Sequence, residues 1–174
     1  MIREKTEDNW SNRGFGICFW LYSHEHGNWI VLDDEKFEDY KALQIMPRLI
    51  ETSFGTDGGL KPKHIERAKR LFETPDDHEE TRKAMYTLQK ILDGFAIEDT
   101  VYSLGKEENG KQCLIIKGNQ TAEVYFAMYK KKQEHLKFPD AKEAAINLIK
   151  RVAPSKDLEQ RMLTAYEETL SQLN

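Results

Sequence analysis

The segment TPDDHEETRKAMYTLQKILDG, residues 74–94, carries the strongest structural signal in the chain. Thr74 is a typical N-cap residue, Pro75 suits the first helical position, and acidic residues follow where they complement the helix dipole. Gly94 is a typical residue for the end of a helix. Between them, apolar residues recur at helical spacing, namely Ala84, Met85, Leu88, Ile91 and Leu92. We therefore expect a long amphipathic helix here with its apolar face in the core.

The preceding segment, PKHIERAKRLF at residues 62–72, is also amphipathic, because its apolar residues share one face and its charged residues the other. The connection between the two helices is short, which predicts that they pack as an antiparallel pair. The stretch SFGTDGGL, residues 53–60, contains three glycines and is predicted to be a loop.

The N-terminal third is predicted to hold a β-hairpin followed by a helical segment. Residues 14–22, GFGICFWLY, are rich in aromatic and β-branched side chains and apolar on both faces, which favours a central strand. Residues 28–32, NWIVL, would be its hairpin partner, with residues 23–27 as the turn. Residues 33–51 begin with acidic side chains and then show helical spacing, so we predict a helix that Pro47 bends or breaks.

After Gly94 the apolar period changes from helical to alternating. Two alternating runs, residues 95–104 and 112–118, flank Asn109-Gly110, the pair favoured in tight hairpin turns. Residues 121–128 alternate like a fifth strand, although the lysine-rich continuation also suits a helix.

The C-terminal portion is predicted to hold two helices, one after Asp140 and one recapped at Ser155 after the break at Pro154. The sum is an α+β fold. We expect a mainly antiparallel sheet of two hairpins, with four or five strands, packed with about five helices in one domain over residues 1–174. Residues 1–12 are compatible with a flexible terminus.

The composition bounds the class of protein. A chain of 174 residues with 39% hydrophobic and 32% charged side chains is typical of one folded domain with a well-solvated surface. The polar start MIREKTEDNW is no secretion signal and no apolar run is long enough to cross a membrane, so we expect a cytoplasmic protein. Cys18 and Cys113 each lie in an apolar run, which indicates buried thiols.

The charge is unevenly distributed. The net charge of −4 is too small for a DNA mimic and has the wrong sign for a generic nucleic-acid binder. Acidic side chains gather in two clusters, which would also be explained as the starts of helices. These clusters could also form a surface that binds a basic partner. The residues of that surface would be Asp33, Asp34, Glu35, Glu38, Asp39, Asp76, Asp77, Glu79 and Glu80.

No G-x-S-x-G motif, phosphate-binding loop or other cofactor motif is present, so we expect no cofactor and favour a non-enzymatic protein. The leading hypothesis is an inhibitory protein that binds another protein, as immunity proteins, antitoxins and phage inhibitors do. Its carboxylates would take the place of substrate phosphates in a basic partner such as a nuclease.

Two alternatives stay open. An RNA-associated protein would use the basic-aromatic residues Tyr125, Tyr129, Lys130, Lys131 and Lys132. A metal-dependent hydrolase would use His24 and His26 in WLYSHEHGNW, residues 20–29. Because no third ligand is evident near that stretch, we interpret it as the polar tip of the predicted hairpin.

Overall fold

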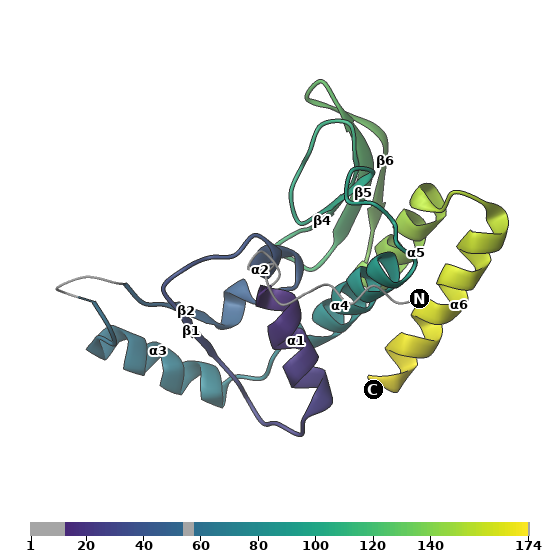
Figure 1. Ribbon diagram of the computed structural model, residues 1–174. Helices are drawn as coiled ribbons and strands as arrows, with labels where there is room; N and C mark the ends of the chain where they lie inside the picture. The colour runs from purple at the N-terminus through teal and green to yellow at the C-terminus, as the bar shows by residue number, and fades with distance from the viewer. Residues whose placement is uncertain (1–12, 54–57, 174) are drawn as a thin grey trace.

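The computed structural model describes residues 13–53 and 58–173 (Figure 1). The predictions for residues 1–12, and those for residues 54–57 of the glycine-rich loop, lie outside the described part. Within it the chain forms a mixed α and β structure with six α-helices, one two-stranded sheet and one four-stranded sheet. The predicted α+β class is confirmed, whereas the predicted mainly antiparallel sheet is wrong.

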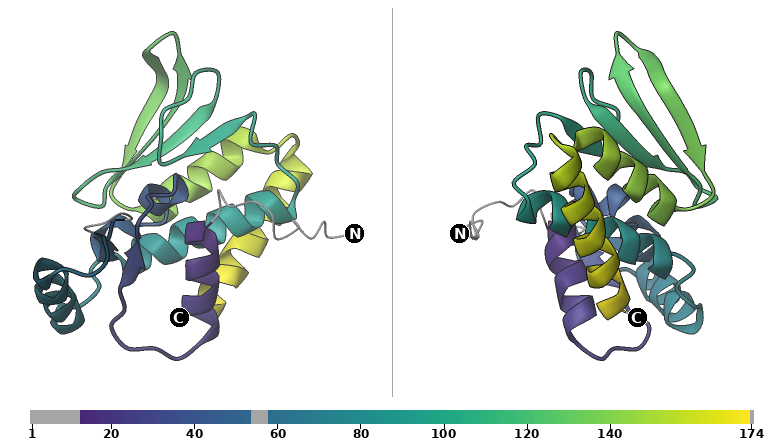
Figure 2. Two further views of the ribbon diagram at one scale, coloured as in Figure 1. Left: turned by 60° about the vertical axis from the view of Figure 1, so that its left-hand side comes forward. Right: turned by 90° about the vertical axis from the view of Figure 1, so that its right-hand side faces the viewer.

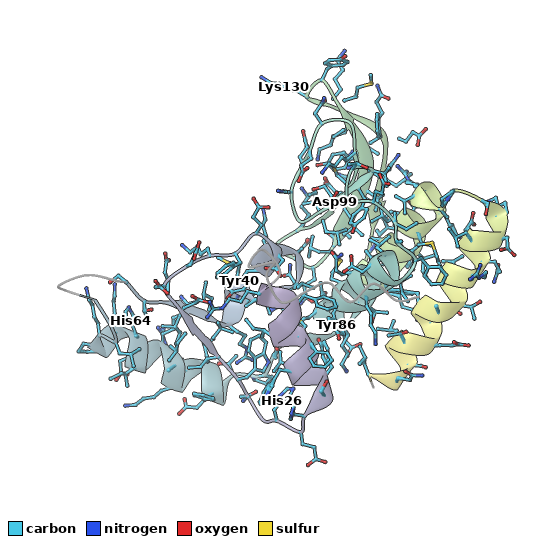
Figure 3. All side chains as sticks on the ribbon, viewed as in Figure 1. His26, Tyr40, His64, Tyr86, Asp99 and Lys130 are labelled. Carbon is cyan, nitrogen blue, oxygen red and sulfur yellow. The ribbon has the colours of Figure 1, made fainter. Side chains whose placement is uncertain are left out.

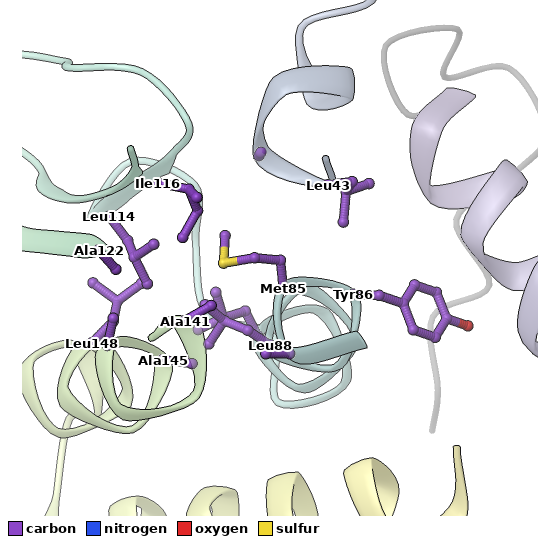
Figure 4. Close-up of a cluster of buried hydrophobic side chains, with 14 of the residues drawn as sticks. Leu43, Met85, Tyr86, Leu88, Leu114, Ile116, Ala122, Ala141, Ala145 and Leu148 are labelled. Carbon is purple, nitrogen blue, oxygen red and sulfur yellow. The ribbon is translucent and has the colours of Figure 1, made fainter. Parts of the chain in front are cut away.

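Helix α4, Glu79–Gly94, lies at the centre of the fold, as its sequence predicts. Residues 81–88 are buried without interruption, so this helix contacts neighbours on all sides. Figure 4 shows Tyr86 pointing toward the N-terminal helix, while Leu88 faces helix α5 and Met85 lies between Leu43 and the sheet. One continuous core therefore joins the two ends of the chain through α4.

The four-stranded sheet has the order β3-β4-β5-β6, with β3 at Tyr102–Leu104, β4 at Gln112–Ile116, β5 at Ala122–Met128 and β6 at Lys131–Phe138. Helix α5, Ala141–Val152, covers one face of it, and α6, Lys156–Gln172, packs on α4 and α5 (Figure 2). Both C-terminal helices begin where predicted. The Asp140 carboxylate accepts from Glu143 N, and the Ser155 hydroxyl accepts from Leu158 N.

The hairpins of this sheet differ from the predicted ones. Strand β5 is confirmed, and the lysine-rich continuation is strand β6, which turns back through Tyr129 and Lys130 at φ of 49° and 62°. Strands β3 and β4, predicted as a hairpin, are parallel. Gly110 has the expected positive φ of 82°, but the loop at residues 105–111 returns to the start of β4, where Gly110 N donates to Ala127 O and extends the pairing of β4 with β5.

The predicted strand at residues 14–22 is wrong, because this segment forms helix α1, Arg13–Ser23. Its buried residues Gly14, Cys18 and Leu21 are spaced four and three apart, which is one face of a helix. The rings of Phe15 and Tyr22 pack against Tyr86 of α4 in tilted arrangements, at ring-centroid distances of 4.8 and 5.2 Å. Packing against α4 therefore overrides the β propensity of the aromatic residues.

The partner strand is also paired differently. Strand β1, Val31–Asp33, runs parallel to β2, Leu49–Glu51, in the small sheet. The predicted helix at residues 33–51 is reduced to α2, Asp39–Ala42, and a 3₁₀ turn at Met46–Arg48 that contains Pro47.

Helix α3, Pro62–Glu73, is confirmed, but it does not lie along α4 as predicted. It projects at one end of the molecule and packs mainly against β2 (Figures 1 and 2). Helix α4 also starts later than predicted, with His78 and not Thr74 as its N-cap residue. Asp76 binds inward to buried arginines and accepts from His78 N, so the residues before Glu79 form a turn.

The two cysteines are buried thiols, as predicted. Burial raises the pKa of Cys18 to about 12, more than the Arg82 charge lowers it. In the described part of the chain, no helix combines the length and the apolar content that crossing a membrane requires.

Candidate functional site

A polar pocket of about 330 Å³ lies where α1 and α2 meet the end of α4 and the four-stranded sheet. Its walls combine a few apolar side chains with several carboxylates and two lysines. The residues used below are Glu38, Asp39, Gln89, Asp99, Tyr102, Lys106, Glu108 and Lys111. Concave sites with a few converging polar groups are the usual places for ligand binding, so we take this pocket as the candidate site.

Asp39 links the pocket to helix α1. Its Oδ2 accepts from Phe15 N at 3.0 Å, so the carboxylate caps the start of α1 from a different element. A Cβ on Gly14 would come within 3.0 Å of this carboxyl group, which explains the glycine. The buried Oδ1 has no hydrogen-bond donor within the described residues. Burial raises the pKa of Asp39 above its usual value although the Phe15 and Gly14 N–H groups lower it.

An ion cluster forms another part of the pocket wall. Lys106 Nζ lies 2.6 Å from Glu38 Oε2 and 2.9 Å from Glu108 Oε1, and Lys111 pairs with Glu108. The hydrogen bonds from Lys111 and Lys106 lower the pKa of Glu108 to about 2. Glu108 therefore stays ionised throughout the physiological pH range.

The pocket has an excess of acceptors. Four carboxylates, from Glu38, Asp39, Asp99 and Glu108, face two lysines, so the formal charge is −2 when all six groups are ionised. Gln89 donates through Nε2 to the Tyr102 hydroxyl at 3.2 Å, which leaves its Oε1 as a further acceptor. This arrangement suits a group that carries positive charge and several N–H donors.

Of the first acidic cluster predicted to bind a partner, two residues line this pocket and one lies inside the fold. Asp33 is 4% exposed, pairs with Arg13 Nε at 3.1 Å and accepts from the Tyr40 hydroxyl at 2.7 Å. Asp34 and Glu35 are exposed. Asp33 therefore holds α1, β1 and α2 together, and the exposed pair stays a candidate for partner contact.

The second acidic cluster is divided in the same way. The Asp76 carboxylate lies 2.6 Å from Arg82 Nη1, 3.8 Å from Arg48 Nε and 3.2 Å from Trp29 Nε1. Both arginines are at least 97% buried, so this carboxylate neutralises charge within the core. Asp77, Glu79 and Glu80 are exposed, and the last two pair with Lys83.

Burial by itself would raise the pKa of Asp76. The hydrogen bond and charge of Arg82, with smaller effects of His78 N and Arg48, instead hold this pKa below its usual value. Asp76 therefore stabilises the interior of the fold, whereas its sequence neighbours Asp77, Glu79 and Glu80 lie at the surface.

The residues predicted to contact RNA are also in different environments. Tyr125 is 2% exposed, donates to Glu107 Oε2 at 2.8 Å and lies under Lys132 Nζ, which is 4.3 Å from its ring centroid. Lys132 also pairs with Glu123 at 2.8 Å. Only the hairpin tip, Tyr129 to Lys131, is free for a ligand, because a buried tyrosine cannot stack on a base.

The histidines of the predicted metal alternative follow the end of α1. His24 Nδ1 is 2.9 Å from Trp20 O, His26 Nδ1 is 2.8 Å from Gly27 O, and both rings stack on Trp20. Figure 3 shows His26 and His64 in separate parts of the molecule. Over residues 13–53 and 58–173, no three His, Cys, Asp or Glu side chains converge as a metal site would require. The predicted hairpin tip is wrong, since a helix precedes this stretch.

Sequence reasoning missed Gln89, Asp99, Tyr102, Lys106 and Glu108 as pocket residues. The segment GKEENGK, residues 105–111, was assigned only to a hairpin turn. Its high density of charged side chains was the one available signal, and it does not show which of them face the pocket.

Comparisons of this chain with known protein families, with characterised proteins and with solved structures give no match.

Proposed function

We propose that this chain is a non-enzymatic protein-binding protein of the inhibitory kind, which uses its acidic surface to occupy a basic region of another protein. The observation that carries the proposal is the acidic pocket, where Glu38, Asp39, Asp99 and Glu108 outnumber Lys106 and Lys111. A lysine or arginine side chain of the partner would enter this pocket and pair with its carboxylates, of which Glu38 and Asp99 are exposed.

Exposed carboxylates close to Glu38 in the sequence support the same proposal. Asp34 and Glu35 follow strand β1, and Glu38 lines the pocket mouth. Opposite charges on two surfaces speed association and suppress wrong partners, and these effects weaken as salt screens them. We therefore expect binding with a fast, salt-sensitive on-rate.

Site-specific crosslinking tests the proposal. A photoreactive residue at Asp99, which is exposed and lines the pocket, should crosslink to a protein in a lysate. The yield should fall with added salt, persist after nuclease treatment and drop on Glu108→Gln. The matched control places the photoreactive residue at Asp157 on α6, another exposed carboxylate outside the pocket. Equal yields at the two positions, or loss of the crosslink on nuclease treatment, would reject the proposal.

A further inference from the structure

Helix α3 leaves part of its apolar face exposed. Ile65 and Phe72 are each 49% exposed, and Leu60 just before the helix is 60% exposed. Ile65 and Phe72 are seven residues apart, so they lie on one side of the helix about two turns from each other. Large apolar side chains grouped in this way are typical of interaction surfaces.

The buried side of α3 lies next to this stripe. His64 is 8% exposed, and Ala68 and Leu71 are half-buried, so this side of α3 packs on strand β2. Arg48 donates to the carbonyls of Leu71 and Thr74, and Asn28 donates to the Phe72 carbonyl. These bonds from other elements hold the C-terminal end of α3 in place. Because these hydrogen bonds fix the orientation of α3, the side chains of Ile65 and Phe72 stay at the surface.

The charge of α3 is opposite to that of the whole chain. Residues 61–73 contain five basic and two acidic side chains, whereas the chain has a net charge of −4. Lys69 lies one turn after Ile65 and pairs with Glu66 at 3.5 Å, and Lys61 is the extended N-cap residue just before the helix. Lys63, Arg67 and Arg70, on the other side of α3, form no ion pair with any residue in the described ranges. Five basic and two acidic side chains give residues 61–73 a formal charge of +3, and they lie around the stripe within a screening length of about 10 Å.

We infer that α3 is a docking surface for an acidic amphipathic helix of another protein, which packs its apolar ridge against Ile65 and Phe72. Its carboxylates pair with Lys61 and Lys69. A helix fits because two side chains two turns apart form a ridge that packs into the groove of another helix. Helix α3 also offers no open strand edge to which an extended segment could add. None of these residues lines the acidic pocket, so this is a second, separate surface.

Two other occupants fit the observations less well. A basic amphipathic helix that lies in a membrane surface buries its whole apolar face in lipid. Here His64, Ala68 and Leu71 already use part of that face against the protein. Pairing of α3 with α3 of a second copy would bring two basic helices together, which like-charge repulsion opposes.

The test uses three synthetic 18-residue helical peptides that share one leucine face and carry glutamate, glutamine or lysine at the remaining positions. Fluorescence anisotropy measures their binding to the full chain. We expect the glutamate peptide to bind about tenfold more tightly than the glutamine peptide at low salt, with the lysine peptide weakest. Phe72→Ala should weaken the glutamate peptide about tenfold, whereas Val101→Ala, a control 42% exposed outside α3, should not.

Charge reversal sharpens the test. The double variant Lys61→Glu/Lys69→Glu should prefer the lysine peptide, while the control Lys130→Glu/Lys131→Glu at the hairpin tip should keep the wild-type preference. Circular dichroism confirms that each variant is folded. Equal binding of the three peptides, no binding of any, or binding unchanged by Phe72→Ala would overturn the inference.

Vesicles of anionic phospholipid and sedimentation of the chain alone probe the other occupants. Binding to vesicles, or self-association, that is lost in Phe72→Ala would overturn the inference in favour of a lipid surface or a second copy. The pocket variant Asp99→Asn should bind the glutamate peptide like the wild type. Peptide binding therefore tests the α3 surface alone, and a negative result there leaves the proposed acidic site to be tested by its own crosslinking experiment.

Discussion

The two halves of the described chain are held together in different ways. The C-terminal part, residues 79–173, consists of α4, the four-stranded sheet, α5 and α6, and its contacts are mainly apolar. The N-terminal part, residues 13–73, has a two-stranded sheet and helices α1, α2 and α3; it shares the apolar core through residues such as Cys18 and Tyr40, and buried carboxylates add to its attachment. Asp39 caps α1, Asp33 pairs with Arg13, and Asp76 holds Arg48 and Arg82.

Both parts expose large apolar side chains, with Tyr129 and Leu136 among those of the C-terminal part. The N-terminal part exposes Phe19, Trp20, Leu60, Ile65 and Phe72 by about half of their area or more. A small sheet with few covering helices cannot bury all of its apolar side chains, so polar bonds supply part of the attachment. The fold of the N-terminal part does not require these apolar side chains to be buried, so they are available to a partner protein.

The largest effect should come from Asp76→Ala, which removes the charge between two buried arginines. We expect a loss of about 3–5 kcal/mol in the free energy of unfolding, since an unpaired buried charge is costly. Urea denaturation monitored by circular dichroism measures it. Asp77→Ala, one residue away and exposed, is the control and should change little. A loss equal in the two variants would show that the buried network does not hold the N-terminal part.

A comparable apolar test in the C-terminal part is Leu148→Ala, in the side of α5 that faces the sheet. Leu148 is fully buried, and its truncation should cost about 2–5 kcal/mol through lost burial and the cavity left behind. The same denaturation experiment checks it. If the cost were below that of an exposed leucine such as Leu136, the apolar description of this part would be wrong.

A smaller effect is expected at Gly105, which follows strand β3 and packs against Ala42 at the end of α2. Its φ is +80°, and a Cβ there would lie 2.8 Å from the Ala42 Cβ. Gly105→Ala should destabilise the protein by about 1–3 kcal/mol through backbone strain and overpacking. Gly110→Ala, also at positive φ but with open space around it, separates strain from overpacking and should cost less.

Acid titration tests the pairing of Asp76 with the two buried arginines. Because the folded pKa of Asp76 is below its unfolded value of 3.8, its pairing stabilises the protein above about pH 4. This contribution is lost as the pH falls through the folded pKa. The unfolding free energy of Asp76→Asn should therefore vary less between pH 5 and pH 2 than that of the wild type, in urea titrations at each pH. Parallel profiles would contradict this assignment.

The smallest stability effect should follow Ile65→Ser/Phe72→Ser on α3. Both side chains are half-exposed, so we expect a change within about 0.5 kcal/mol per site although two large apolar groups are removed. Thermal denaturation measures it. A loss of several kcal/mol would mean that these residues belong to the core of the N-terminal part.

The accuracy of the sequence predictions follows the same division. Helices α5 and α6 were predicted because Asp140 and Ser155 cap them locally, and β5 because its alternation is strong. Helix α1 was missed because its aromatic and β-branched residues favour a strand. The spacing of Gly14, Cys18 and Leu21 was the signal that could have shown a helix.

The candidate site was predicted only in part. Glu38 and Asp39 were named as binding residues and do line the pocket, but for Asp39 the sequence does not show that the carboxylate caps α1. The environment of Asp76 depends on Arg48 and Arg82, which are 28 positions before it and six after it in the chain. No local pattern distinguishes such a carboxylate from its exposed neighbour Asp77.

The sequence by itself determined the elements whose signals lie within a few residues. These are α4, α5, α6, β5 and the mixed α and β class, because helical spacing, strand alternation and capping residues act locally. The tertiary structure alone decided that α1 is a helix, that β3 and β4 are parallel and that Glu38, Asp39, Asp99 and Glu108 meet in one pocket. Those outcomes depend on partners distant in the chain, whose energies no local stretch encodes.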